Sequence, residues 1–229
     1  MTITPSTPSN LLSQLASSLG SAMPTTMSTS TPGNDLYEAY LFGLFVGAAT
    51  SSGYALEIHD EDGPASYLHF RRSPGRLCNG RSKTGHKFSH ALISYPGRPA
   101  LEVHVGVKVV GKSLVTHEAD VLVLRSDVAS RARVASADPR SAKALLVVEA
   151  KYYTNAVTVS TAREFLGLRH DLSAKNMVFV STSADDTCAA LLAGTPALES
   201  DDGVLPRLAG EADLTALFSR ILKTYRQRR

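Results

Sequence analysis

Two short apolar segments of this chain carry acidic residues, and this combination limits what the chain can fold into. Segment 117–124 is HEADVLVL and segment 144–153 is ALLVVEAKYY. Both have the Val- and Leu-rich character and the length, about four to eight apolar residues, that are typical of buried β-strands. Side chains alternate between the faces of a strand, so Glu149 and Lys151 point the same way. Burying an unpaired charge is costly, and a metal ion bound by Asp120 and Glu149 beside Lys151 would offset that cost.

These residues resemble the catalytic signature of a known superfamily. Asp120 followed by Glu149-Ala150-Lys151 is similar to the Asp…Glu-x-Lys pattern of the PD-(D/E)xK nucleases, which have the restriction-endonuclease-like fold. This Glu-x-Lys is the only one in the chain, and it ends a Val/Leu segment that follows an Asp-bearing one. The resemblance covers roughly residues 35–183, through the order of the expected elements. The alternative interpretation is an ordinary ion pair between Glu149 and Lys151 at a strand end.

The resemblance implies a metal-dependent phosphodiesterase that acts on nucleic acid, DNA rather than RNA. Asp120 and Glu149 would be the carboxylate ligands of Mg²⁺ or Mn²⁺, and the backbone carbonyl of Ala150 would be a further ligand. Lys151 would orient or help deprotonate the attacking water and offset phosphate charge. The alternative function is a non-catalytic interaction or nucleic-acid-binding module on the same fold within a larger complex. The intact set of Asp120, Glu149 and Lys151 argues against that alternative.

Glu38 is a further candidate for the catalytic site. Many members of the superfamily contribute a Glu from the first core helix, and the apolar segment 36–49 predicts such a helix around Glu38. A second interpretation competes with this one. Asp35 and Glu38 have the spacing of a capping box, with Asp35 as the N-cap and Glu38 at the third helical position. The two interpretations remain open, and both could hold.

A basic segment, 69–90, is the candidate surface for the phosphate backbone. It contains no acidic residue, and aromatic residues alternate with its basic ones. The candidate nucleic-acid contacts are Arg71, Arg72, Arg81, Lys83 and Lys87 from this segment, together with Arg163. A solvated charged loop is the alternative interpretation. Cys78, His86 and His90 could supply three metal ligands, but no fourth is evident and their spacing fits no standard zinc site.

The composition predicts one α/β domain preceded by a tail. Residues 1–33 are rich in Ser, Thr and Pro and contain no charged side chain, so we expect them to be disordered. Leucines at helical spacing in this tail could dock on a partner protein: Leu11, Leu12, Leu15 and Leu19. Residues 34–229 should form the nuclease-like domain, a restriction-endonuclease-like core with a central mixed β-sheet flanked by helices.

The expected elements of this domain follow from hydrophobic periodicity and turn residues. We expect a strand hairpin formed by 54–58 and 66–71 around the turn at 60–63, strands at 101–110 and 177–181, and helices at 161–171, 184–192 and 212–225. Segment 88–95 fits either a short helix or a strand. Segment 126–143 is polar and should be a loop that is helical in part.

The remaining composition places few limits on partners. A net charge of +3 is compatible with a polyanion but does not identify one. Two cysteines form no disulfide framework and suit a reducing cytoplasm. No charge-free apolar run approaches the length of about 18 residues that a membrane span needs. We therefore expect a cytoplasmic protein without a membrane partner, acting alone, as a homodimer, or with a partner bound through its N-terminal tail.

Overall fold

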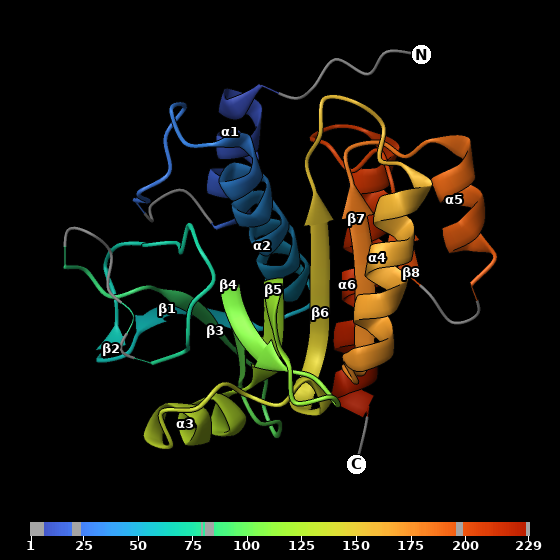
Figure 1. The fold of residues 1–229 in the computed structure, drawn as a ribbon. Coiled ribbons are helices and arrows are strands. Elements are labelled where there is room, and N and C mark those ends of the chain that lie inside the picture. Colours follow the sequence, from blue (N-terminus) through green and yellow to red (C-terminus); the bar gives the residue numbers. More distant parts are fainter. Residues whose placement is uncertain (1–6, 20–23, 79, 81–84, 196–198, 228–229) are drawn as a thin grey trace.

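The computed structural model describes residues 7–19, 24–78, 80, 85–195 and 199–227 (Figure 1). In this part of the chain, one mixed sheet has the strand order β2-β1-β3-β4-β5-β6-β7-β8. The strands are β1 (Ala55–Asp60), β2 (Gly63–Pro64), β3 (His90–Ser94), β4 (Leu101–Val110), β5 (Thr116–Arg125), β6 (Ala144–Lys151), β7 (Asn176–Ser181) and β8 (Glu199–Asp201). The α-helices are α1 (Pro8–Ser18), α2 (Gly33–Ser51), α3 (Ser126–Val134), α4 (Val159–Asp171), α5 (Asp186–Ala193) and α6 (Ala209–Gln227). The predicted α/β class with a central mixed sheet between helices is confirmed.

The sheet changes direction at β6. Every neighbouring pair from β2 to β6 is antiparallel, whereas β6, β7 and β8 run parallel to one another. Parallel neighbours need a crossover, and α4 supplies it between β6 and β7. The ring of Phe165 in α4 packs at 5.0 Å from that of Phe179 in β7, which fixes the crossover helix to the sheet. The ends of β5 and β6 therefore lie between α2 and α4 (Figure 1).

Two hydrophobic cores cover the two faces of the sheet. One core is formed with α1, α2 and α6, and the other with α3, α4 and α5. Helix α2 is the centre of the first core, because its apolar side chains occupy nearly all sides of the helix and are buried. Phe45 of α2 packs edge-on against Phe218 of α6, with ring centroids 5.1 Å apart. The predicted helix 36–49 is confirmed, and it is buried on several sides as its composition suggests.

The N-terminal segment corrects one expectation. Residues 8–18 form α1, and Leu11 and Leu15 are only 1% and 2% exposed, so this part of the tail is not disordered. Helix α1 lies on α2 where small residues allow close approach: a Cβ added at Gly43 would lie 3.0 Å from Cδ1 of Leu15. The leucines whose spacing suggested docking on a partner are thus used inside the chain. The Ser- and Thr-rich composition predicted disorder, whereas residues 8–18 form an amphipathic helix that packs on α2.

The predicted hairpin is only half right. The turn between β1 and β2 is present, but β2 has two residues, and segment 66–71 forms no strand. The pairing is short: beyond Pro64, one further hydrogen bond runs from the N–H of Ala65 to the carbonyl of Ile58. The long partner of β1 is β3, which settles the ambiguous segment 88–95 as a strand. Within the described residues, no helix is long and apolar enough to cross a membrane.

Candidate functional site

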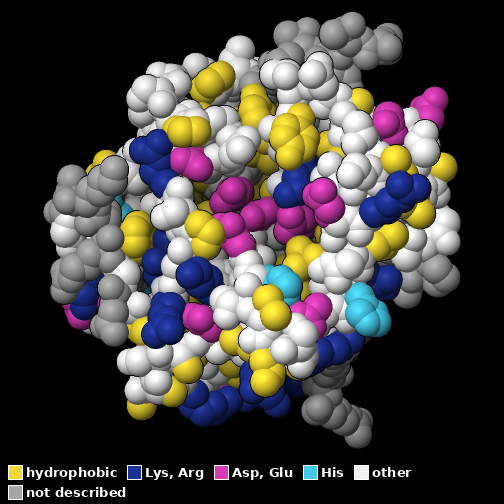
Figure 2. Space-filling view, viewed as in Figure 1, with side chains coloured by type: hydrophobic (Ala, Val, Ile, Leu, Met, Phe, Trp, Pro, Cys, Tyr) yellow, Lys and Arg dark blue, Asp and Glu magenta, His cyan; other side chains and the backbone are white. Residues whose placement is uncertain are grey.

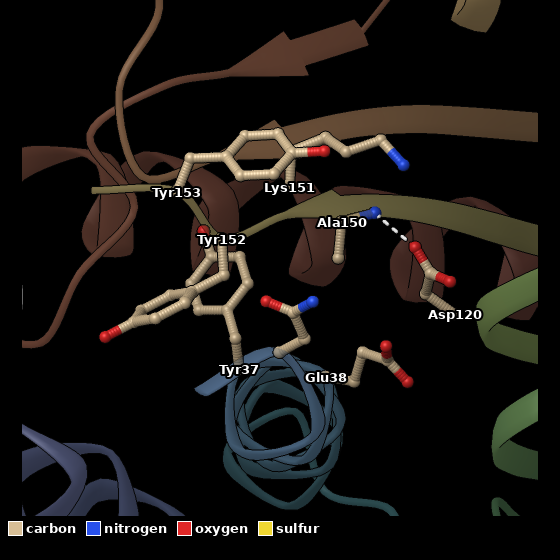
Figure 3. Close-up of a pocket in the computed structure, with 8 residues that line it drawn as sticks. Tyr37, Glu38, Asp120, Ala150, Lys151, Tyr152 and Tyr153 are labelled. Atoms are coloured by element: carbon tan, nitrogen blue, oxygen red, sulfur yellow. Dashed lines mark hydrogen bonds between the residues drawn. The ribbon is translucent and has the colours of Figure 1, made fainter. Parts of the chain in front are cut away.

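A pocket of about 130 Å³ lies where α2 meets the ends of β5 and β6. Its lining residues are Asn34, Tyr37, Glu38, Asp120, Ala150, Lys151, Tyr152 and Tyr153. Figure 3 shows that Glu38, Asp120 and Lys151 direct their charged groups to the same side of this pocket, and that the three tyrosines form its other side. Residues that are far apart in the sequence are therefore brought together by three separate elements.

Asp120 is held at the pocket by the neighbouring strand. Its Oδ2 accepts a 2.6 Å hydrogen bond from the backbone N–H of Ala150, and the side chain is nearly buried. Burial, followed by the charge of Glu149, raises the pKa of Asp120 to about 7, although the hydrogen bond from Ala150 opposes that rise. A carboxyl group with such a pKa is poised to lose its proton when a cation arrives.

Glu38 reaches the same pocket from α2. Burial raises its pKa to about 9, and the nearby carboxylates, that of Asp120 first, add to the rise. Helix α2 begins at Gly33 with Pro32 as its N-cap, and the N-cap makes no side-chain hydrogen bond. The capping-box interpretation is therefore wrong, because Asp35 lies inside the first turn and pairs with Arg72 at 2.8 Å instead. The helix starts three residues earlier than the capping motif implied, with its N-cap at Pro32 and not at Asp35.

Glu149 and Lys151 form the ion pair that the sequence allows, with 2.6 Å between Oε1 and Nζ. Burial lowers the pKa of Lys151, but the attraction of Glu149 and then Asp120 outweighs burial and leaves that pKa above its usual value. Lys151 is consequently a firmly protonated cation. The pair is not isolated at a strand end, because both residues belong to a larger group of charges.

Five acidic residues share this end of the sheet: Asp35, Glu38, Glu118, Asp120 and Glu149. Figure 2 shows acidic side chains gathered in a hollow at the centre of one face, with basic side chains around it. Burial and the charge of Glu149 raise the pKa of Glu118 as well. Several carboxylates that repel one another and resist ionisation are a fitting donor set for a hard divalent cation such as Mg²⁺ or Mn²⁺. The residues expected to hold the ion therefore suit it.

The predicted nucleic-acid contacts have different surroundings. Arg72 and Arg163 present exposed side chains, the latter from the second turn of α4. Arg71 is half-buried, with its guanidinium 4.4 Å from the centre of the Phe88 ring, and Lys87 pairs with Asp62. Arg71 and Lys87 thus have structural partners already. Arg81 and Lys83 lie outside the described residues.

The sequence interpretation missed Asn34 and Tyr37 as pocket residues. Asn34 lies one helical turn before Glu38, so helical spacing alone could have placed it beside that acid. Tyr37 packs its ring at 5.4 Å from that of Tyr152, which follows β6 directly. The aromatic side of the pocket therefore joins the start of α2 to the end of β6.

Comparisons of this chain with family models, curated proteins and solved structures found no match. The interpretation of the pocket consequently depends on its own residues and on the resemblance of Asp120, Glu149 and Lys151 to the nuclease signature.

Proposed function

We propose that this protein is a metal-dependent nuclease that hydrolyses phosphodiester bonds, in DNA rather than in RNA. One observation carries the proposal: Glu38 of α2 and Asp120 of β5 line a single pocket with one firmly protonated lysine, whose ion-pair partner is Glu149 of β6. The order α2, β4, β5, β6, α4, β7 is also the order expected of a restriction-endonuclease-like core, and this finer assignment belongs to the proposal. The preference for DNA follows from the resemblance alone.

Asp120 and Glu149 would hold Mg²⁺ or Mn²⁺, with the backbone carbonyl of Ala150, and Glu38 would complete the set of carboxylates. When bound, such an ion lowers the pKa of a water molecule and offsets negative charge on the phosphate. Lys151 keeps its proton at neutral pH because its pKa is raised. That state suits it to orient the water and to neutralise the phosphate, and it disfavours Lys151 as the base that removes the proton.

The alternative, a binding module without catalysis, has one observation in its favour. Lys151 and Glu149 already satisfy each other at 2.6 Å, as an ion pair with a purely structural role would. The raised pKa values of Glu38 and Asp120 weigh against it, because a structural site gains nothing from keeping further buried acids beside that pair.

A cleavage assay separates the two functions. The protein is incubated with linear, circular and single-stranded DNA and with RNA, in Mg²⁺, Mn²⁺ or EDTA. We expect cleavage of DNA with either metal ion and none with EDTA. Glu149→Gln and Lys151→Ala should each lower the rate by about 10²- to 10³-fold, as the loss of a group that stabilises charge in the transition state does.

The matched control is Glu57→Gln, an exposed acid on β1 outside the pocket, which should cut at the rate of the unchanged protein. DNA binding without any metal-dependent cleavage would favour the binding module. Cleavage that survives both Glu149→Gln and Lys151→Ala would show that this pocket is not the active site.

A further inference from the structure

A second group of metal-binding side chains lies under α3, apart from the acidic pocket. His90 of β3 and Glu102 and His104 of β4 are all buried, and one ligand atom of each lies within 4.8 Å of those of the other two. Glu102 and His104 are two residues apart on one strand, so their side chains share a face. None of the three residues lines the acidic pocket.

The spacing of these atoms suits a small tetrahedral ion. Oε2 of Glu102 lies 2.9 Å from Nε2 of His104 and 3.5 Å from Nε2 of His90. Two ligand atoms that each lie about 2.0–2.1 Å from a tetrahedral zinc ion are roughly 3.3 Å apart. The rings of His90 and His104 stack with centroids 4.7 Å apart, so the two candidate ligands lie side by side. Small shifts would therefore convert the cluster into a coordination shell.

Arg133 of α3 supports the acid from outside the cluster. Its two terminal nitrogens lie 2.8 Å and 2.6 Å from the two carboxylate oxygens of Glu102. Carboxylates that bind metal ions are commonly held in this way by hydrogen bonds from a second group. His90, Glu102 and Arg133 also line a cavity of about 500 Å³, whose wall includes the acids Asp60 and Asp62. The cavity gives an ion an entry path, and its acids attract one.

We propose that Nε2 of His90, Oε2 of Glu102 and Nε2 of His104 bind a transition-metal ion of the zinc class. The fourth coordination position would open onto the cavity. Two histidines and one carboxylate with one open position are a set found in catalytic zinc sites. Nε2 of His104 can ligate only through its lone pair, so on binding the hydrogen of this neutral ring would be carried by Nδ1 and no net proton would be released. This site is independent of the proposed nuclease function and stands if that function fails.

The test measures Zn²⁺ and Co²⁺ binding to the full chain after treatment with a chelator. It is done in Asp120→Asn protein, so that the acidic pocket cannot supply the binding. We expect one equivalent of Zn²⁺ per chain, visible d–d absorption from Co²⁺, and shifted ring-nitrogen NMR signals of His90 and His104. His104→Gln should abolish stoichiometric binding, whereas the matched histidine variant His117→Gln, outside the cavity, should retain it. Arg133→Gln should weaken binding by about 10- to 100-fold.

Two outcomes would overturn the site. One is the absence of Zn²⁺ or Co²⁺ binding in Asp120→Asn protein. The other is unchanged binding in folded His104→Gln protein. If His104→Gln does not fold, the test uses the histidine NMR signals of the Asp120→Asn protein. Ring-nitrogen signals of His90 and His104 that do not shift when Zn²⁺ is added would exclude this site. Such a result would leave a buried hydrogen-bonded network without a metal ion.

Discussion

The backbone N–H of Ala150 donates a 2.6 Å hydrogen bond to the side chain of Asp120, in place of a main-chain partner. The ladder between β5 and β6 ends at the pair Val121 and Val148, although both strands continue beyond it. Past that pair β5 bonds only to β4, and β6 only to β7. The two strands therefore separate where their acids begin, and the carboxylate of Asp120 bridges the gap beside the pocket.

Asp120→Asn should keep the fold and lose the stabilisation by Mg²⁺ or Mn²⁺. An Asn oxygen can still accept from Ala150, and removal of a repelling charge should leave the metal-free protein at least as stable. Asp120→Ala leaves the N–H of Ala150 without its acceptor and should cost about 1–3 kcal/mol of unfolding free energy. Thermal melts with and without Mg²⁺ or Mn²⁺ check both variants. An Asn variant that Mg²⁺ stabilises as much as the unchanged protein would contradict the assigned ligand role.

Stability of the metal-free protein should fall as pH rises from about 5 to 9. The pKa of Glu38 is about 9 in the folded state, above its unfolded value, so the folded protein binds more protons in this interval. The protonated Glu38 carboxyl group stabilises the folded protein relative to the unfolded one, and raising the pH through the pKa of Glu38 in the folded state removes this contribution. Glu38→Gln should flatten the dependence, and urea titrations at several pH values in EDTA measure it. If the unfolding free energy of the unchanged protein and of Glu38→Gln fell equally with pH, the pKa of Glu38 would not be raised in the folded protein.

Leu15→Ala should destabilise the protein by about 2–5 kcal/mol, as other buried leucine truncations do. Leu15 is 2% exposed and packs on α2, which carries Glu38. Leu114→Ala is the matched control, since Leu114 is 66% exposed and should tolerate truncation. Chemical denaturation measures both variants. A Leu15→Ala protein as stable as the control would mean that α1 contributes nothing to the folded state in solution.

Arg163→Ala should weaken DNA binding and reduce the slope of log affinity against log salt by about 1, as the loss of one phosphate contact does. The side chain is exposed on the second turn of α4, and α4 follows the loop after β6. Lys87→Ala should have a smaller effect, because Lys87 is already paired with Asp62 and Glu61. Fluorescence anisotropy at several salt concentrations compares the two. A larger loss of DNA affinity in Lys87→Ala than in Arg163→Ala would place the bound DNA beside Lys87 and away from α4.

Much of the fold was predictable because local patterns agree with it. The strands around Asp120 and Glu149 follow from their apolar runs. Asp120 and Lys151 line one pocket, and Glu149 forms an ion pair with Lys151. Pairing over long distances was not predictable: nothing near β1 indicates that its partner is β3. His90, Glu102 and His104 were missed as a group for the same reason, because His90 lies on a different strand from the other two. Helix α1 was not predicted as an ordered part of the fold, because its few leucines are buried only by packing on α2.

The separation of Glu38, Asp120 and Lys151 along the chain has a consequence for synthesis. Because they come from α2, β5 and β6, the pocket exists only after residues 33–151 have folded together. A chain still on the ribosome, with β6 unmade, has Glu38 and Asp120 but neither Glu149 nor Lys151. Any activity of this pocket is therefore delayed until β6 and most of the protein have been made.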